Sequence, residues 1–399
     1  MSILYCLLIF GASITTSLFC AWAFPFLVHN ARRFQILDKP EARKIHKFPM
    51  PRLGGVAIIP AIWLGCAFCL LMAQASDLAP SSLSSGEFGA IVVGLLIGSS
   101  GSFLLGLFDD LKPIKATAKL LGQILIAGLT ISFLPVPESV LGFAIPAWAW
   151  TTFAFGWLVV LPNSVNLLDG VDGLTGALLT AFFFVLSILA CTSGQVEWLG
   201  VFAPLVAALL IFLRYNWSPS SIFLGDSGSL SLGYCVAYLS LCFPFWPEFS
   251  RDFNPLTLFA LSSVWLIDTG AAILRRYFRN LRLESDSEFD LSFWFRQKRA
   301  LGSIVKPDKN HIHHWLLDRG FTPSAVVLII SGAWLAIFLS CLPALGLNRI
   351  LERLPLGVSY LIGGAGLSML LLIGSIVLFG SESRFLRGSS GARSKERAA

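Results

Sequence analysis

Apolar runs long enough to cross a lipid bilayer recur along the whole of this sequence. A helix that spans the hydrocarbon core needs roughly 20 mostly apolar residues, and such a run must be helical because in lipid its backbone groups can bond only to one another. Charged residues make up 13% of the chain, whereas soluble domains carry about 25%. The sequence therefore predicts an all-α integral membrane protein with about eleven transmembrane helices. We place them at residues 3–28, 53–73, 88–108, 117–135, 144–161, 173–192, 197–213, 229–247, 256–274, 322–345 and 356–380.

The distribution of lysine and arginine indicates how these helices are oriented. All 29 basic residues except Arg251, Arg349 and Arg353 belong to segments that follow an odd-numbered run. Because basic loops stay on the cytoplasmic side, we expect those loops and the C-terminus in the cytoplasm and the N-terminus in the periplasm. The uncharged start of the chain fits an uncleaved first span better than a removed signal peptide.

The chain reads as one membrane domain over residues 1–380, followed by a basic tail at 381–399 that we expect to be disordered. The net charge of +6 comes from the cytoplasmic loops, and no basic patch interleaved with aromatic residues lies outside them, so nucleic acid is not an expected partner. Cys66 and Cys69 form a CxxC inside an apolar run, which favours packing over a zinc or redox site.

Six carboxylates lie at the ends of apolar runs on the predicted cytoplasmic side. An acid beside hydrocarbon is costly, so its presence indicates a task such as binding a metal or relaying a proton. Several acids at one interface, with basic loops beside them, predict a magnesium and phosphate site that faces the cytoplasm. The six are Asp109, Asp110, Asp169, Asp172, Asp226 and Asp268.

The segment NSVNLLDGVDGL carries the most specific of these patterns. Asn163 and Asn166 are three residues apart, as are Asp169 and Asp172, so each pair can share one face of a helical turn. The neighbouring glycines let the backbone approach a ligand closely. Asparagine and aspartate oxygens suit a hard divalent ion, a ribose or a phosphate.

Two other acidic motifs leave alternatives open. The adjacent Asp109 and Asp110 repel each other unless a cation or a proton relieves them, but they also fit a solvated helix end beside basic residues. Asp226 in FLGDSGS could cap a helix or lie beside metal-bound phosphates. Phe223, just before it, could stack on a base or anchor the helix at the interface.

Basic and histidine-rich loops complete the predicted face. His311, His313 and His314 lack a fourth ligand for tetrahedral zinc, and with lysines nearby they suit hydrogen bonding to phosphates. Lys44 and Arg52 precede a glycine pair in the first cytoplasmic loop, where ordinary positive-inside charge explains them equally well.

In order, spacing and topology, these motifs resemble those of the polyprenyl-phosphate N-acetylhexosamine-1-phosphate transferases (glycosyltransferase family 4). The resemblance covers residues 39–320 and rests on KPEARKIHKFPMPRLGG, DDLKPIKATAK, NSVNLLDGVDGL, GDSGS and NHIHH. It implies transfer of a sugar-1-phosphate from a UDP-sugar to undecaprenyl phosphate with release of UMP, as the first lipid-linked step of a cell-envelope glycan. It also implies Mg²⁺ or alternatively Mn²⁺ as the cofactor, a bacterial cytoplasmic (inner) membrane location with a cytoplasmic active site, and a homodimer as one oligomeric state.

The resemblance also implies roles for individual residues. Asp226 resembles the principal magnesium ligand, with Asn166 close to the metal. Asp109 and Asp110 resemble the acidic pair that assists the lipid-phosphate nucleophile, and Lys119 resembles the lysine that binds the diphosphate. The residues expected to bind substrate are Lys44, Asn163, Asp169, Asp172, Phe223 (at the uracil-stacking position), His311, His313 and His314.

The His-Ile-His-His form resembles the branch that uses UDP-N-acetylglucosamine rather than UDP-N-acetylmuramyl-pentapeptide. That second donor and a deoxy-aminosugar remain alternatives, because the stretch between Asp268 and the histidines is longer than the family pattern, with an acidic and aromatic segment at 283–297. A membrane transporter is the alternative from another class. Transporters place coupling acids near the bilayer midplane, whereas these acids gather at one face.

Overall fold

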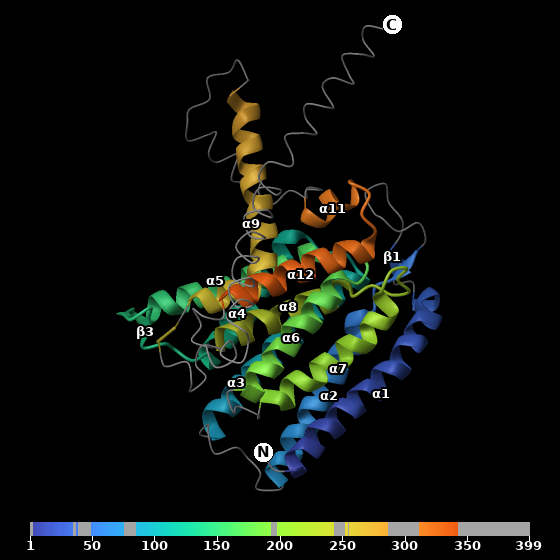
Figure 1. Ribbon diagram of the computed structural model, residues 1–399, viewed down its shortest axis with the longest axis vertical. Helices are drawn as coiled ribbons and strands as arrows, with labels where there is room; N and C mark the ends of the chain where they lie inside the picture. Colours follow the sequence, from blue (N-terminus) through green and yellow to red (C-terminus); the bar gives the residue numbers. More distant parts are fainter. Residues whose placement is uncertain are drawn as a thin grey trace, which may run out of the picture.

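The protein is mainly helical in its computed structural model, which describes residues 3–34, 37–38, 49–75, 85–192, 198–242, 252–253, 255–285 and 311–341 (Figure 1). Five strands of two residues each accompany the helices. The helices are α1 (Ile3–Phe34), α2 (Gly54–Ala75), α3 (Ser85–Leu111), α4 (Ala116–Thr130), α5 (Ala147–Leu168), α6 (Leu174–Thr192), α7 (Leu199–Asn216), α8 (Gly225–Cys242), α9 (Pro255–Ser285), α11 (Ile312–Leu317) and α12 (Pro323–Cys341), with a short 3₁₀ turn η1 (Ile131–Phe133).

Eight of the described helices are long and apolar enough to cross a membrane, and α2 contributes a shorter apolar stretch at Gly54–Phe68. The prediction of an all-α integral membrane protein is therefore confirmed. The first ten predicted runs each fall on a helix, α1 to α9 and α12. The run at 356–380 and the tail at 381–399 lie outside the described residues, so the count of eleven and the orientation of the termini remain predictions.

The end predicted for the fifth run is wrong. The fifth run was expected to end at residue 161, before Pro162, but α5 continues through Pro162 to Leu168. A proline inside a helix removes one hydrogen bond, and in a membrane neighbouring helices make this tolerable. Pro162 is buried against Gly233 of α8, where a Cβ would lie 2.8 Å from it. The continuation places Asn163 and Asn166 on the last two turns of a helix.

Helix α8 is the centre of the bundle. Every residue in it except Asp226 is buried, and its neighbours include α2, α3, α5, α6 and α9. Such close packing needs small residues where helix backbones meet. A Cβ on Gly106 of α3 would overlap the carbonyl oxygen of Asp226, and one on Gly55 of α2 would overlap the backbone of Gly228. The start of α8 is thus enclosed by two glycines on other helices.

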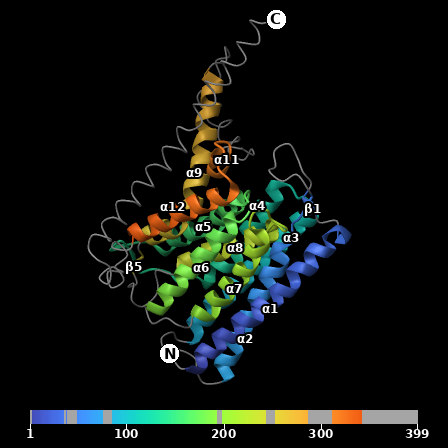
Figure 2. The same ribbon diagram turned by 45° about the vertical axis from the view of Figure 1, so that its right-hand side comes forward.

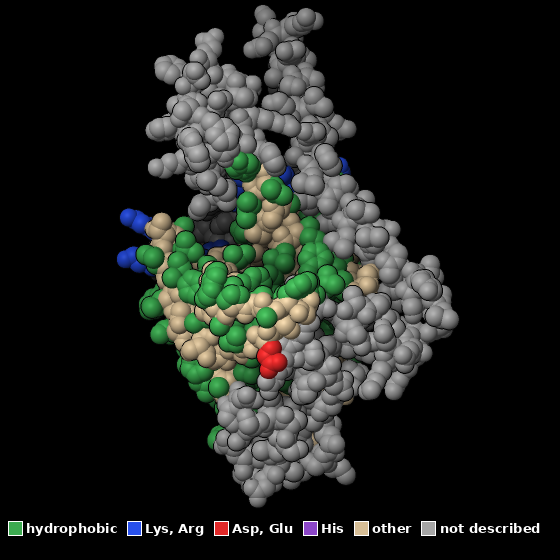
Figure 3. Space-filling model, turned by 90° about the vertical axis from the view of Figure 1, so that its left-hand side faces the viewer, with side chains coloured by type: hydrophobic (Ala, Val, Ile, Leu, Met, Phe, Trp, Pro, Cys, Tyr) green, Lys and Arg blue, Asp and Glu red, His purple; other side chains and the backbone are tan. Residues whose placement is uncertain are grey.

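Outside this centre, helices α1, α2 and α7 pack side by side at one edge of the bundle, and α9 extends beyond the other helices (Figures 1 and 2). Large apolar side chains remain exposed on the outer helices, such as Phe10 and Trp22 of α1 and Leu125 of α4. The described surface in Figure 3 is covered mainly by hydrophobic side chains. This surface is suited to lipid, in which an exposed apolar side chain has no cost.

Two small sheets connect the helices. Strands β1 (Leu37–Asp38) and β2 (Met50–Pro51) pair antiparallel just before α2. Strand β3 (Ser139–Val140) forms a hairpin with β4 (Phe143–Ala144) and pairs in parallel with β5 (Asp252–Phe253). The first sheet helps to place the site, because the carbonyl of Pro51 accepts a hydrogen bond from the backbone of Phe223 at 2.8 Å.

We expect Gly106→Ala to destabilise the protein by about 1–3 kcal/mol, the usual cost of overpacking a tight interior. The added methyl would push α3 away from the start of α8. The control is Gly156→Ala on α5, where no atom lies within 4 Å of the added carbon and alanine is the better helix former. Thermal unfolding in detergent would measure both, and equal melting temperatures would contradict the close α3–α8 contact.

Candidate active site

Lys119 joins two carboxylates that come from helices distant in sequence. Its ammonium donates to Asp109 Oδ2 at 3.0 Å and also to Asp226 Oδ2. The side chain of Asp109 is 19% exposed, and those of Lys119 and Asp226 are 15% exposed. Two acids this close repel each other unless a cation lies between them. Direct contacts among α3, α4 and α8 thus bring these three residues together, and the roles expected for them remain predictions.

The turn between α3 and α4 is built to hold this lysine in place. Asp109 uses its second oxygen to accept a hydrogen bond from the backbone N–H of Ile114 at 2.8 Å. That bond closes the turn, and α4 begins two residues later, at Ala116. Lys119 therefore lies in the first turn of α4, and its side chain can reach back to the end of α3.

Asp110 is bound to the start of α8. Its two oxygens accept hydrogen bonds from the backbone N–H groups of Asp226 and Ser227, each at 2.9 Å. These N–H groups belong to the first turn of a helix and have no partner within it. Gly225 has a φ of +74°, and a Cβ there would lie 2.7 Å from Asp110 Oδ2. Asp110 thus anchors α8, and its predicted part in catalysis remains a prediction.

The two asparagines of α5 contact different neighbours. Asn166 Oδ1 accepts a hydrogen bond from the Ser229 hydroxyl of α8 at 2.7 Å, which places it one turn from Asp226. Asn163 instead exchanges hydrogen bonds with Gln123 of α4, at 2.8 and 3.1 Å. Asn163 therefore joins α4 to α5 in this structure, and its role in substrate binding stays a prediction.

The loop at residues 169–172, which we call the acidic loop, lies beyond the end of α5. Burial raises the pKa of Asp169 to about 7, with the nearby carboxylates of Asp226 and Asp110 acting in the same direction. Part of its surface stays exposed. Asp172 accepts hydrogen bonds from the Ser220 hydroxyl at 2.9 Å and its backbone N–H at 3.2 Å. Of the two acids in this loop, Asp169 is therefore the one whose pKa is affected by the carboxylates of Asp226 and Asp110.

The histidine segment, residues 311–314, lies against the acidic loop. His313 is 1% exposed, and a Cβ on Gly170 would lie 2.8 Å from its Nε2. Its Nδ1 has no hydrogen-bond partner among the described residues. Burial lowers the pKa of His313 to about 3, with the neighbouring His314 and His311 adding to the shift. The ring is therefore neutral at ordinary pH, and one of its nitrogens is buried without a partner among the described residues.

Phe223 is the remaining predicted residue that the structure describes. Phe223 is half-buried, and its carbonyl accepts a hydrogen bond at 3.0 Å from Gly54 N–H at the start of α2. It lies three residues before Asp226, and its stacking on uracil stays a prediction. Lys44 lies outside the described residues, as do residues 286–297 of the inserted segment.

The chemistry of these residues fits a hard divalent cation. Asp226, Asp109 and Asn166 offer carboxylate and amide oxygens, which Mg²⁺ prefers. Among the described residues, no three His, Cys, Asp or Glu side chains gather closely enough to hold a metal by themselves. Magnesium sites commonly use one or two carboxylates together with substrate phosphates. Lys119 already lies between the two carboxylates. The residues therefore suit a metal ion that is bound by the protein and by a substrate phosphate together.

Sequence reasoning gave no role to several residues that shape the site. Gln123, Ser229 and Ser220 all bond to predicted residues. Asp268, one of the six carboxylates predicted for the site, bonds to His311, and Arg52 of the first cytoplasmic loop acts electrostatically on Asp169. Gln123 could have been identified from the sequence, because it is a polar residue inside an apolar run and lies one helical turn after Lys119. Ser220 carried none, because its partner lies 48 residues away.

Comparison with known proteins places this arrangement in a wider context. A model of glycosyl transferase family 4 matches residues 92–243, which include Asp109, Asp110, Lys119, Asn166 and Asp226. The chain is 29% identical over 343 residues to a probable undecaprenyl-phosphate N-acetylglucosaminyl 1-phosphate transferase of Bacillus subtilis, covering 79% of this chain and 83% of the relative.

Two further relatives differ in the sugar that they are named for. A decaprenyl-phosphate N-acetylglucosaminephosphotransferase of Mycobacterium tuberculosis is 29% identical over 316 residues, which are 75% of this chain and 73% of the relative. A phospho-N-acetylmuramoyl-pentapeptide-transferase of Lacticaseibacillus paracasei is 29% identical over 316 residues, which are 72% and 84% of the two chains.

Removing the ammonium between the two acids tests the electrostatics of the site. We expect Lys119→Ala to lower the free energy of unfolding by about 1–3 kcal/mol, because Asp109 and Asp226 are left without their shared donor. Added Mg²⁺ should raise the melting temperature of this variant more than that of the parent protein. Lys112→Ala, at an exposed position between α3 and α4, is the control. Equal melting temperatures for both variants would contradict the shared ion pair.

The neutral His313 predicts a dependence of stability on pH. In the unfolded chain it takes up a proton near pH 6.5, but in the folded protein only near pH 3. Between these values the unfolded state binds more protons at this residue, so the contribution of His313 to stability falls as the pH falls, by about 1 kcal/mol per pH unit. The raised pKa of Asp169 acts in the opposite direction, so the effect of His313 is read from the difference between the variant and the parent protein. His313→Gln should weaken this fall, and His29→Gln, at an exposed residue of α1, should not. Thermal unfolding from pH 7 to pH 4.5 would measure the pH dependence of stability. Parallel curves for the parent protein and His313→Gln would refute the conclusion that the His313 ring is neutral.

Proposed function

We propose, from the premise that this chain belongs to glycosyl transferase family 4, that it transfers an N-acetylhexosamine-1-phosphate from a UDP-sugar to undecaprenyl phosphate. UMP is released, and the product begins a lipid-linked cell-envelope glycan. The observation that carries the proposal is the convergence of Asp109, Lys119 and Asp226 from three helices. Asn166 and the acidic loop lie beside them.

The proposed reaction forms one phosphorus–oxygen bond and breaks another. A phosphate oxygen of the lipid attacks the phosphorus that carries the sugar, and UMP leaves with the oxygen that bridged the two phosphorus atoms. Such transfers depend mainly on positioning and on neutralising charge. Lys119 supplies a fixed positive charge beside the position of the diphosphate. The partly exposed Asp109 is the acid that we assign to the lipid phosphate, because both oxygens of Asp110 are bonded to α8.

The proposed cofactor is Mg²⁺, with Mn²⁺ as an alternative. Asp226 and Asn166 would hold the ion, and Asp169 lies within the same electrostatic field. When bound, it would neutralise the negative charge of the diphosphate. A pKa near 7 leaves Asp169 partly protonated at neutral pH. It can therefore change protonation state without the large cost that an ordinary carboxyl would incur there.

The proposed donor is UDP-N-acetylglucosamine. Two of the relatives above are named for N-acetylglucosamine, and the His-Ile-His-His form agrees with this choice. The muramoyl-pentapeptide donor is the second candidate, because one relative of similar identity is named for it. We propose that the residues that separate the two donors lie near the histidine segment, which the acidic loop contacts at Gly170.

The chain is a multi-pass membrane protein. We propose the bacterial cytoplasmic (inner) membrane, with the site facing the cytoplasm. The distribution of lysine and arginine supports this, since the basic segments follow the same ends of the helices as the site residues. The lipid tail can then stay in the bilayer while its phosphate reaches Lys119. A homodimer remains a prediction.

A direct assay tests the proposal. Purified protein in detergent, given undecaprenyl phosphate, Mg²⁺ and UDP-N-acetylglucosamine, should release UMP and form a labelled lipid product. Asp226→Asn keeps the shape of the side chain but removes its charge, and should lower the rate by about 100-fold or more. EDTA should stop the reaction. Glu138→Gln, at an exposed acid beside the β3–β4 hairpin, should leave the rate unchanged.

The possible results of this assay distinguish an error in the proposed donor from an error in the proposed reaction. Product formed only from UDP-N-acetylmuramyl-pentapeptide would replace the proposed donor and keep the reaction. No product from any UDP-sugar, with a protein that unfolds cooperatively on heating, would refute the transferase. Full activity in Asp226→Asn would refute the assigned site.

A further inference from the structure

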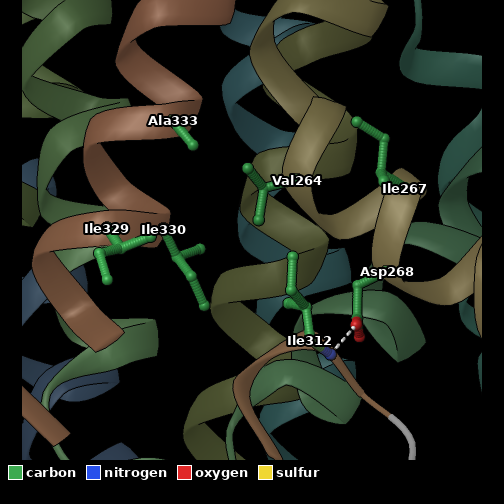
Figure 4. A pocket seen from close by; sticks show the side chains of 7 residues that line it. All are labelled: Val264, Ile267, Asp268, Ile312, Ile329, Ile330 and Ala333. Atoms are coloured by element: carbon green, nitrogen blue, oxygen red, sulfur yellow. Dashed lines mark hydrogen bonds between the residues drawn. The ribbon is translucent and has the colours of Figure 1, made fainter. Parts of the chain in front are cut away.

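A buried acid in the middle of α9 is bonded to the histidine segment. Asp268 is 2% exposed and lies within the spanning stretch Leu258–Tyr277. It accepts a hydrogen bond from the backbone N–H of Ile312 at 2.8 Å (Figure 4), and its other oxygen lies 2.7 Å from His311 Nδ1. A carboxylate in such a place is costly unless it is paired. Both of its oxygens are paired with the same short segment.

The surroundings make this pairing strong. Figure 4 shows Asp268 at the edge of a small hollow between α9, α11 and α12, with Ile330 and Ala333 of α12 on the opposite side. All the other residues that line the hollow are apolar. Because apolar surroundings hold no competing donors, electrostatic interactions there are stronger than in water. The bond between Asp268 and His311 is therefore well placed to fix the orientation of the imidazole ring.

The bond also determines which nitrogen of His311 carries a proton. An ionised carboxylate can only accept hydrogen bonds, so Nδ1 of His311 must be the donor. The other ring nitrogen, Nε2, is then left for a ligand. A partner that holds one nitrogen sets both the tautomer and the direction of the other.

The histidine segment connects the oriented His311 ring to the site. The ring of His311 stacks on that of His313, with centroids 5.7 Å apart and an angle of 7°. His313 in turn lies against Gly170, next to Asp169. Asp268 thus connects, through two stacked rings, to the acidic loop beside the central carboxylates.

We infer that Asp268 is a positioning residue for the transfer reaction. It holds His311 in the Nδ1–H tautomer, presents Nε2 to the substrate, and keeps the histidine segment against the acidic loop. The kinetic consequence rests on the proposed function, whereas the hydrogen bond and the tautomer do not.

The decisive variant is Asp268→Asn. Its amide oxygen can still accept from Ile312, but its amide N–H₂ now faces Nδ1 of His311 and favours the opposite tautomer. We expect kcat to fall by about 10- to 100-fold, the range typical when a residue that orients a functional histidine is changed, with a smaller change in KM. Asp268→Ala removes both bonds and should also lower the melting temperature. Ser263→Ala, at another buried polar residue of α9, is the control that should change neither.

A double-mutant cycle separates positioning from general stability. If Asp268 acts through His311, adding Asp268→Asn to His311→Gln should lower kcat by less than twofold beyond His311→Gln alone. Independent, multiplying losses would overturn the inference, as would wild-type kcat in Asp268→Asn.

A spectroscopic measurement tests the pairing of Asp268 with His311 independently of the proposed function. The ¹⁵N NMR spectrum of histidine-labelled protein, recorded without substrate, should show one ring in the Nδ1–H form that is lost in His311→Gln and changed to the Nε2–H form in Asp268→Asn. A wild-type protein without transferase activity but with this signature would refute the proposed function and leave the Asp268–His311 pairing standing. A His311 ring in the Nε2–H form in the wild-type protein would overturn the inference whatever the activity.

Discussion

The cost of placing carboxylates at the edge of a membrane governs the arrangement of this protein. Each central acid is compensated by a donor from another part of the chain. Lys119 serves Asp109 and Asp226, and the backbone of α8 serves Asp110. Asp268 follows the same rule with the histidine segment. Since none of these acids could be buried alone without a large penalty, the helices that bear them have to meet, and the site is a consequence of that requirement.

The centre of the bundle is adapted to these contacts. Helix α8 is buried along its length although it carries several serines, and it can be so because its neighbours are protein rather than lipid. The hydroxyls of Ser231 and Ser240 donate to backbone carbonyls of the helix, and that of Ser229 donates to Asn166. Close approach of α3, made possible by Gly106, brings Asp110 to the amides that start α8. The close packing at small residues therefore lets the carboxylate of Asp110 reach its hydrogen-bond donors.

Much of this could be predicted from sequence, for identifiable reasons. Apolar runs located the helices, because lipid leaves a chain few other options. Family motifs brought Asp109, Lys119 and Asp226 together, as the structure does. The end of α5 was missed because proline usually stops helices in water. The anchoring of α8 by Asp110 and the exchange of hydrogen bonds between Asn163 and Gln123 could not be foreseen. Both depend on which helices become neighbours, and no local pattern encodes that.

The long sequence separation between Asp110 and α8 has a consequence for how the protein is made. As the chain emerges from the ribosome, Lys119 becomes available to Asp109 almost at once, being ten residues further on. The partners of Asp110 follow only 116 and 117 residues later. During that interval the carboxylate of Asp110, near the end of α3, lacks these partners and depends on water at the membrane edge. The arrival of α8 in the membrane is therefore the step of biosynthesis that closes the site, and a chain truncated before it would leave α3 with a carboxylate that nothing else in the helix can satisfy.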